Sequence, residues 1–257
     1  TNASQVGLVV AAFNATLTRC NGVYEKDLAL HLNLVAGSTN VIYYNPTTDP
    51  YTTMGNWNTQ LQQALNTTLT GTGTSLAVNN AAYDVGHMFG ANHTYNGPCA
   101  AQDQFSAPTS YEPGSGTTLM AYAQSCDNSN IILANGGNAP TGTYFHAGSI
   151  AQILDFLSTN TNVCVVPEIL TNSPPMITSI TSGLQSPINL PRSTPFELKG
   201  QATDLDGDIL TYCWEQMDLG PPHGAVNVAC GSTKGPIFRS YDPSPNPSRF
   251  FPDLQYI

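Results

Sequence analysis

Two histidines on either side of a glycine constrain this chain more than any other feature. His87 and His93 flank Gly90 within residues 82–97, and they are two of only five histidines in 257 residues. A helix that carries His87 is expected to end at Gly90, because glycine adopts a left-handed backbone at little cost. The turn that follows can bring His93 back beside His87. Two converging imidazoles suit Zn²⁺, which accepts neutral histidine nitrogen in a tetrahedral shell.

The pattern His87-x-x-Gly90-x-x-His93 resembles the second half of the His-Glu-x-x-His-x-x-Gly-x-x-His signature of metzincin metallopeptidases. In this alignment Tyr83 takes the position of the first histidine, and Asp84 takes that of the catalytic glutamate. The resemblance implies that His87 and His93 are zinc ligands, with Tyr83 in the third position and Asp84 in place of the general base. The structural alternative is that both histidines are ordinary polar residues at a helix end.

A second resemblance lies downstream, in residues 111–123. This segment reads Tyr-Glu-Pro-Gly-Ser-Gly-Thr-Thr-Leu-Met-Ala-Tyr-Ala and is similar to the approach to a metzincin Met-turn, with Met120 as its methionine. Together with residues 90–97 and 144–146, it follows the order of secreted bacterial reprolysin-like peptidases. The resemblance covers roughly the first two thirds of the chain. It implies a zinc metalloendopeptidase that hydrolyses peptides or proteins with a metal-activated water, above an apolar floor formed by Met120.

The segment before His87 is shorter than this resemblance leads us to expect. Such enzymes place further strands and a long loop between the second helix and the zinc helix, whereas residues 75–84 predict only a short strand. We therefore interpret residues 71–87 as the place of an internal deletion, which removed the His-Glu pair and joined a strand to the tail of the zinc helix. A site with two ligands is expected to bind zinc weakly and to hydrolyse peptides slowly or not at all.

The resemblance implies an α/β metzincin-like catalytic domain with a mixed sheet and a zinc helix, and the helices and strands that apolar periodicity predicts are in keeping with it. Helical spacing of apolar residues indicates helices, and alternation indicates strands. The predicted helices cover residues 3–17, closed by Asn21-Gly22, then 57–69 and 148–157, and the predicted strands cover residues 28–35 and 41–44. His146 stands just before the last helix. We expect it to pack or to cap that helix, and the alternative is that it approaches the metal in place of the missing histidine.

Prolines divide the chain into the predicted domains. Residues 1–166 form the reprolysin-like domain and residues 167–175 a linker, because prolines there discourage helix and sheet. Residues 176–257 predict an all-β, Ig-like sandwich that resembles cadherin-like or PKD-like accessory modules, complete or truncated. Its alternating positions include residues 196–198 and 210–214.

Three carboxylates stand close together in this second domain, at Asp204, Asp206 and Asp208. Oxygen ligands of this kind suit Ca²⁺. Aspartate and glycine are also the residues that tight turns select. A calcium site and an acidic hairpin turn therefore both stay open.

The charge and cysteine content limit which partners the protein can bind and in which cellular compartment it resides. Only 9% of residues are charged and the net charge is −10, so no basic surface is available to hold nucleic acid. No apolar run is long enough to insert into a membrane. Six cysteines, four before residue 170 and two after it, suit internal disulfides in a secreted protein, and none has the Cys-x-x-Cys spacing of a metal site. No pattern specifies an oligomeric state.

Three interpretations of function remain. The first is a secreted zinc metalloendopeptidase whose activity is impaired. The second is a catalytically inactive secreted binding or adhesion protein with a calcium-binding β-sandwich. The third is a deletion product that folds poorly.

Overall fold

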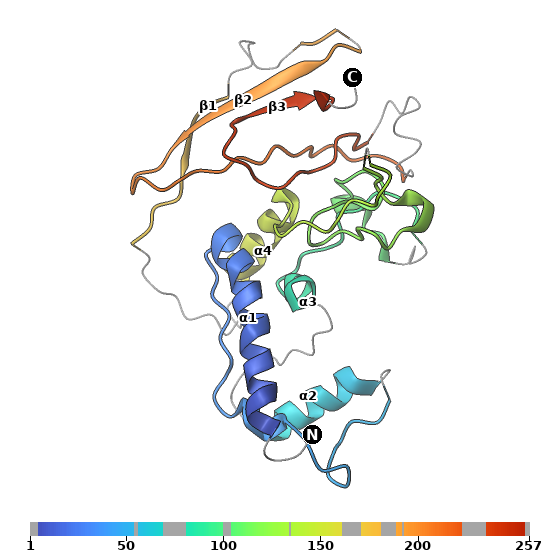
Figure 1. The fold of residues 1–257 in the computed structure, drawn as a ribbon, viewed down its shortest axis with the longest axis vertical. Helices are drawn as coiled ribbons and strands as arrows, with labels where there is room; N and C mark the ends of the chain where they lie inside the picture. The colour runs from blue at the N-terminus through green and yellow to red at the C-terminus, as the bar shows by residue number, and fades with distance from the viewer. Residues whose placement is uncertain are drawn as a thin grey trace. The chain divides into compact units, whose positions relative to one another are not determined.

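The computed structural model describes residues 5–53, 56–68, 81–99, 104–133, 135–160, 171–180, 189–191, 193–222 and 235–254. The chain divides into two compact units. The first comprises Thr1–Asn92 and Ser149–Val166, and the second comprises His93–Gly148 and Pro167–Ile257. Figure 1 labels the helices and strands, which are described below within each unit.

Helix α1 spans Val6–Leu28 and is longer than predicted. It runs through the predicted stop at Asn21-Gly22 and ends at Ala29, which adopts a left-handed backbone with φ of 52°. Asn21 does not cap its own helix. Its side chain instead donates to Leu32 O at 2.9 Å and accepts from Leu32 N at 2.8 Å. The predicted stop was wrong because the side chain of Asn21 binds the backbone of Leu32 and does not end the helix.

The predicted strands 28–35 and 41–44 were also wrong. Leu28 closes α1, and the side chain of Asn21 binds both backbone groups of Leu32 that a neighbouring strand would otherwise bind. Val41 closes the short 3₁₀ helix η2, Ser38–Val41. Among the described residues of the first unit no strand is present, so the mixed sheet expected there is not found in them.

The other helices follow the sequence more closely. Helix α2, Trp57–Thr68, and helix α4, Ala147–Thr159, confirm two predicted helices. Helix α3, Ala81–Met88, replaces the end of the strand predicted over residues 75–84, whose earlier part lies outside the described residues. Helices α1 and α3 pack together (Figure 1), and the fully buried Tyr24 donates a hydrogen bond to Ala82 O at 2.7 Å.

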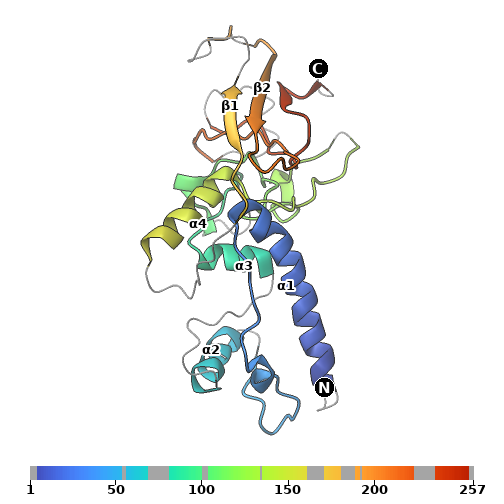
Figure 2. The same cartoon turned by 90° about the vertical axis from the view of Figure 1, so that its left-hand side faces the viewer.

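The second unit contains a three-stranded antiparallel sheet in the order β1-β2-β3. Its strands are β1, Met176–Ile180, β2, Phe196–Thr203, and β3, Ser248–Phe251 (Figure 2 labels β1 and β2, which lie side by side). The strand predicted at residues 196–198 is therefore confirmed. Residues 210–214 form only an isolated bridge between Tyr212 and Ser244. The complete sandwich, and the domain boundary at residues 167–175, stay predictions.

A polar core holds the rest of the second unit together. Residues 93–146 contain only short 3₁₀ turns and isolated bridges in their described parts. Many of their polar side chains are nevertheless buried, including Thr94, Asn96, Glu112 and Thr118. Buried polar groups must find hydrogen-bond partners. The contacts between these side chains and the backbone therefore replace a regular sheet as the framework of this segment.

Candidate metal centre

His87 lies in the last turn of α3 and is half-buried. Its helix ends as predicted, since Gly90 has φ of 85° and Ala91 N donates to Gly86 O at 3.0 Å. The ring Nδ1 of His87 lies 2.7 Å from Ala91 O. A carbonyl oxygen only accepts, so Nδ1 carries the proton and Nε2 carries the lone pair in the neutral ring. This is the tautomer in which metal-binding histidines are commonly fixed.

Tyr83 and Asp84 lie one helical turn before His87 on α3. The edge of the Tyr83 ring packs on His87, with centroids 4.6 Å apart and planes at 87°. Asp84 lies close enough to Tyr24 to affect the pKa of that tyrosine. Burial raises the pKa of Tyr24, and the charges of Cys20 and Asp84 raise it further. The roles of Tyr83 as third ligand and of Asp84 as general base stay predictions.

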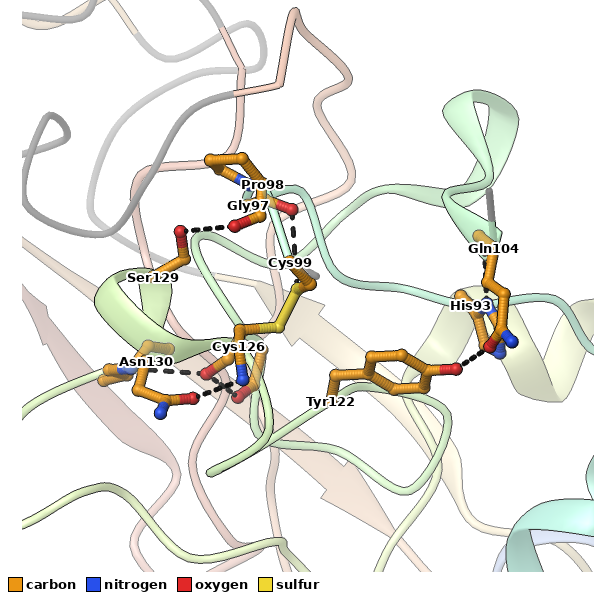
Figure 3. The surroundings of a disulfide bond; sticks show 12 residues. His93, Gly97, Pro98, Cys99, Gln104, Tyr122, Cys126, Ser129 and Asn130 are labelled. Atoms are coloured by element: carbon orange, nitrogen blue, oxygen red, sulfur yellow. Dashed lines mark hydrogen bonds between the residues drawn. A yellow bond between two sulfur atoms is a disulfide. The ribbon is translucent and has the colours of Figure 1, made fainter. Parts of the chain in front are cut away.

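His93 belongs to the second unit and is only 8% exposed. Its Nδ1 hydrogen-bonds to Gln104 O, which again places the ring proton on Nδ1. The ring of Tyr122 packs against it with centroids 4.9 Å apart, and Figure 3 shows His93, Gln104 and Tyr122 together. The hydroxyl of Thr109 donates to His93 O at 2.6 Å. Both the ring and the backbone of this histidine are therefore held in place.

Met120 is fully buried and lies in the same unit as His93. Its carbonyl oxygen accepts a hydrogen bond from Thr94 N at 3.2 Å. The chain thus brings the methionine segment to the residue that directly follows His93. A position of Met120 beneath a metal stays a prediction.

One disulfide closes the loop next to His93. Cys99 and Cys126 are bonded across a sequence separation of 27 (Figure 3), which confirms an internal disulfide. Their neighbour Tyr95 stacks on Tyr122, with centroids 4.7 Å apart. Cys20 and Cys213 form no disulfide with any residue that the structure describes, and the other two cysteines of the chain lie outside the described residues.

The donors present do not complete a three-ligand zinc site in the described part of the chain. No group of three or more histidine, cysteine, aspartate or glutamate side chains is arranged there to hold a metal ion. His87 belongs to the first unit and His93 to the second. Within the described ranges, the donors found together are therefore short of the three protein ligands that a catalytic zinc centre uses.

His146 caps the last helix, as the first of its two interpretations expects. Gly148 N donates to His146 Nδ1 at 3.1 Å at the beginning of α4, and the ring is 1% exposed. Its Nε2 lies 4.0 Å from Glu215 Oε2, and its ring stacks on Tyr111 at 5.4 Å. Nδ1 is thus used for capping and Nε2 lies near a carboxylate, which supports the capping interpretation, and the alternative role as a replacement zinc ligand stays untested.

The acidic cluster forms a turn. Asp204 Oδ1 accepts hydrogen bonds from Asp206 N at 2.8 Å and from Asp208 N at 3.2 Å, and Gly207 has φ of 82°. Asp206 Oδ2 accepts from Ser173 N at 2.5 Å. These are the contacts of a turn stabilised by an aspartate side chain. The calcium site stays a prediction.

Sequence reasoning missed Gln104, Tyr122 and Glu112, which surround the His93 segment. Gln104 carries no signal, because its contact with His93 is made by its backbone. Glu112 carried a weak signal, since it is an acidic residue inside a run of glycine, threonine and apolar residues. Its contacts are described below.

No helix in the described ranges is long and apolar enough to cross a membrane.

A family model described as metallo-peptidase family M12B, reprolysin-like, matches residues 10–151. No curated protein and no solved structure matches the chain. Since the family match covers more than half of the 257 residues, and contains both histidines and Met120, the chain belongs to the reprolysin-like M12B family of metallopeptidases.

Proposed function

We propose that this protein is a secreted zinc metalloendopeptidase by descent, in which His87 and His93 remain as zinc ligands and catalysis is slow or lost. Peptidases of this family generally use zinc, act on peptides or proteins and are typically extracellular. The disulfide between Cys99 and Cys126 agrees with an oxidising compartment. Substrates are accordingly peptides or proteins.

The observation that carries the proposal is the protonation state shared by the two histidines. Each directs Nδ1 at a backbone carbonyl, Ala91 O for His87 and Gln104 O for His93. In each neutral ring this contact places the proton on Nδ1 and the lone pair on Nε2, and the carbonyl fixes the orientation of the ring. An ordinary surface histidine needs no such restraint, so the arrangement favours a retained ligand role.

The shortfall of donors explains why we propose weak activity. Catalytic zinc sites use three protein ligands, and the first histidine of the family signature is Tyr83 here. A tyrosine binds as phenolate, which its ordinary pKa of about 10 makes costly. The family glutamate is Asp84, and a mispositioned general base forfeits roughly 10² to 10⁴ in rate.

Zinc titration of the full chain tests the proposal. Calorimetry with the metal-stripped protein is expected to show weak one-to-one binding of Zn²⁺, weakened further in His87→Ala and in His93→Ala. His31→Ala is the matched control, because this exposed histidine pairs with Glu25 outside the motif. Equal affinities in all four proteins would contradict the ligand assignment.

A fluorogenic casein assay tests the catalytic half of the proposal. We expect turnover that is slow or absent, and any activity present should disappear with a chelator and return with Zn²⁺. Tight zinc binding together with rapid casein cleavage would show that the chain supplies a third ligand and a base after all.

The same shortfall of donors favours a second candidate, a catalytically inactive secreted binding or adhesion protein. In that case neither zinc nor its removal changes casein cleavage, which stays at background. Calcium-dependent thermal stability of the wild type, lost in Asp206→Asn, would support the calcium-binding sandwich of this candidate.

A further inference from the structure

Glu112 is a buried carboxylate in the segment that precedes Met120, and only 1% of its surface is exposed. Five hydrogen-bond donors are directed at it, the most distant being the hydroxyl of Thr117 at 3.4 Å from Oε2. The hydroxyls of Thr94 and Thr118 donate to Oε1, that of Thr94 at 2.7 Å. The backbone N–H groups of Thr117 and Thr118 donate to Oε2 at 2.7 and 3.1 Å. An ionised carboxylate only accepts hydrogen bonds, and these donors satisfy both of its oxygens.

These donors come from two segments that are distant in the sequence. Thr94 directly follows His93, whereas Thr117 and Thr118 stand three and two residues before Met120. The backbone of Glu112 continues the connection, since its N–H donates to Thr94 O at 2.9 Å and its carbonyl accepts from Asn96 N at 2.8 Å. Thr94 N in turn donates to Met120 O at 3.2 Å. Glu112 is therefore where the histidine segment and the methionine segment are joined.

The surrounding packing fixes the position of this carboxylate. Gly116 has φ of 65°, and a Cβ built there would lie 3.1 Å from the Glu112 side chain and 2.6 Å from Ala121 Cβ. There is no space for even one methyl group on this side. The turn before Met120 closes around the carboxylate and cannot rearrange without losing its hydrogen bonds.

Burial and saturation with donors exclude Glu112 as a substitute general base. A base must reach the proton that it accepts, and this carboxylate is enclosed by groups that donate to it. Its contacts instead lead to His93 through Thr94, and Thr109 holds the carbonyl of His93 at 2.6 Å.

We propose that Glu112 is a positioning residue for His93. By fixing Thr94 to the Met120 segment, it holds the His93 ring against Gln104 O in the Nδ1-protonated form. The use of that orientation in metal binding rests on the function proposed above. The orientation itself is a property of the second unit and can be tested without metal.

Nuclear magnetic resonance of the histidine ring nitrogens in the metal-free full chain is the direct test. The wild type is expected to show His93 as a single Nδ1-protonated tautomer, identified by the signals that His93→Gln removes. Glu112→Gln places an amide N–H₂ group among hydrogen-bond donors, which disrupts the contact that holds Thr94. The His93 ring is then less restrained, and its signals should shift to a mixture of tautomers. Glu197→Gln, the same change at an exposed position of β2, should leave them unchanged.

Milder variants keep the test decisive if Glu112→Gln does not fold. Thr94→Val removes one donor hydroxyl at nearly constant volume, and Glu112→Asp keeps the charge. We expect Thr94→Val to shift the His93 tautomer partway, and Glu112→Asp to restore more of the wild-type signal than Glu112→Gln. Unchanged His93 signals in folded Glu112→Gln, or in Thr94→Val when the former does not fold, would overturn the proposal.

Zinc titration separates this inference from the proposed function. With Zn²⁺ alone as the probe, Glu112→Gln is expected to lower affinity about 10-fold or more, the loss usual when an indirect partner of a ligand is removed. If His93→Ala leaves zinc affinity unchanged, the proposed function fails while the tautomer result still decides the role of Glu112. If His93→Ala weakens zinc and Glu112→Gln does not, the positioning role fails alone.

Discussion

The two histidines of the motif are held in opposite ways. His87 lies on a regular helix and is half-buried, with a hydrogen bond to Ala91 O and a T-shaped ring contact with Tyr83. His93 lies in a segment without helix or strand, yet it is 8% exposed and contacts Gln104 and Tyr122. Regular secondary structure is thus not what fixes a side chain most firmly here. A buried polar core closed by a disulfide restrains it more.

The largest expected effect comes from opening that core. The double variant Cys99→Ala/Cys126→Ala should lower the free energy of unfolding of the second unit by about 3 to 4 kcal/mol, because the disulfide closes a loop across a sequence separation of 27. Hydrogen exchange should show lost protection at residues 93–99 and 112–121, with α1 unchanged. Equal loss in α1 would remove the contrast between the two histidines.

Glycine substitutions in the two units should act in opposite directions. A Cβ at Gly97 would lie 2.7 Å from the backbone carbon of Gly114, so Gly97→Ala should destabilise by about 1 to 3 kcal/mol. Gly22 in α1 has open space around it, and Gly22→Ala should stabilise by about 0.5 to 1 kcal/mol. Urea unfolding midpoints measure both. If Gly97→Ala leaves the unfolding free energy unchanged, the backbone around Gly114 can move to accommodate the added methyl group, and the core is less rigid than its contacts suggest.

Truncating the histidines themselves tests the comparison most directly. His93→Ala leaves a buried space and an unpaired Gln104 carbonyl, and should cost about 1 to 3 kcal/mol of stability. His87→Ala removes the hydrogen bond to Ala91 O at a half-buried site and should cost about 1 kcal/mol. Unfolding should be followed with a chelator present, so that metal binding does not contribute. The reverse order of the two losses would contradict our view of the core.

The smallest effect concerns pH and the first unit. Burial raises the pKa of Tyr24 above its ordinary value, so the neutral form is favoured in the fold. The unfolded chain ionises at the ordinary tyrosine pKa near 10, and stability that is full below this pH is lost as the pH rises above it. Between pH 10 and 11 the wild type loses unfolding free energy through this ionisation, and Tyr24→Phe should reduce that loss by up to about 1.4 kcal/mol.

The control for this effect is Tyr44→Phe, the same change at a tyrosine that is 46% exposed. It should leave the alkaline slope of the unfolding free energy unchanged. Identical slopes for Tyr24→Phe and the wild type would show that the buried phenol does not contribute.

Local pattern predicted the features that depend on local residues. Apolar spacing identified α2 and α4, and Gly90 marked the end of the helix that carries His87. The end of α1 escaped prediction because the side chain of Asn21 binds Leu32, a contact that no local pattern encodes. The alternating leucines of residues 28–35 gave a false strand for the same reason.

At the candidate site, sequence alone proposed the two histidines as ligands and Met120 as the Met-turn methionine, because motif spacing carries them, and these roles stay predictions. It did not identify Glu112, whose partners Thr94 and Thr118 come from segments that meet only in the folded chain. Nor did it show that His146 caps α4, since capping by a histidine ring nitrogen has no distinctive spacing. Motif spacing in the sequence thus proposes candidate residues, whereas the contacts that hold them depend on segments that meet only in the fold.

Gly90 shows that a residue of a catalytic signature can also be required by the fold. Its backbone is left-handed, and a Cβ there would press on the Phe156 ring at 3.3 Å. Selection for folding alone would then be enough to keep this glycine, whether or not the chain cuts peptides. A surviving signature glycine in such a chain testifies to architecture, and it says little about whether the enzyme still works.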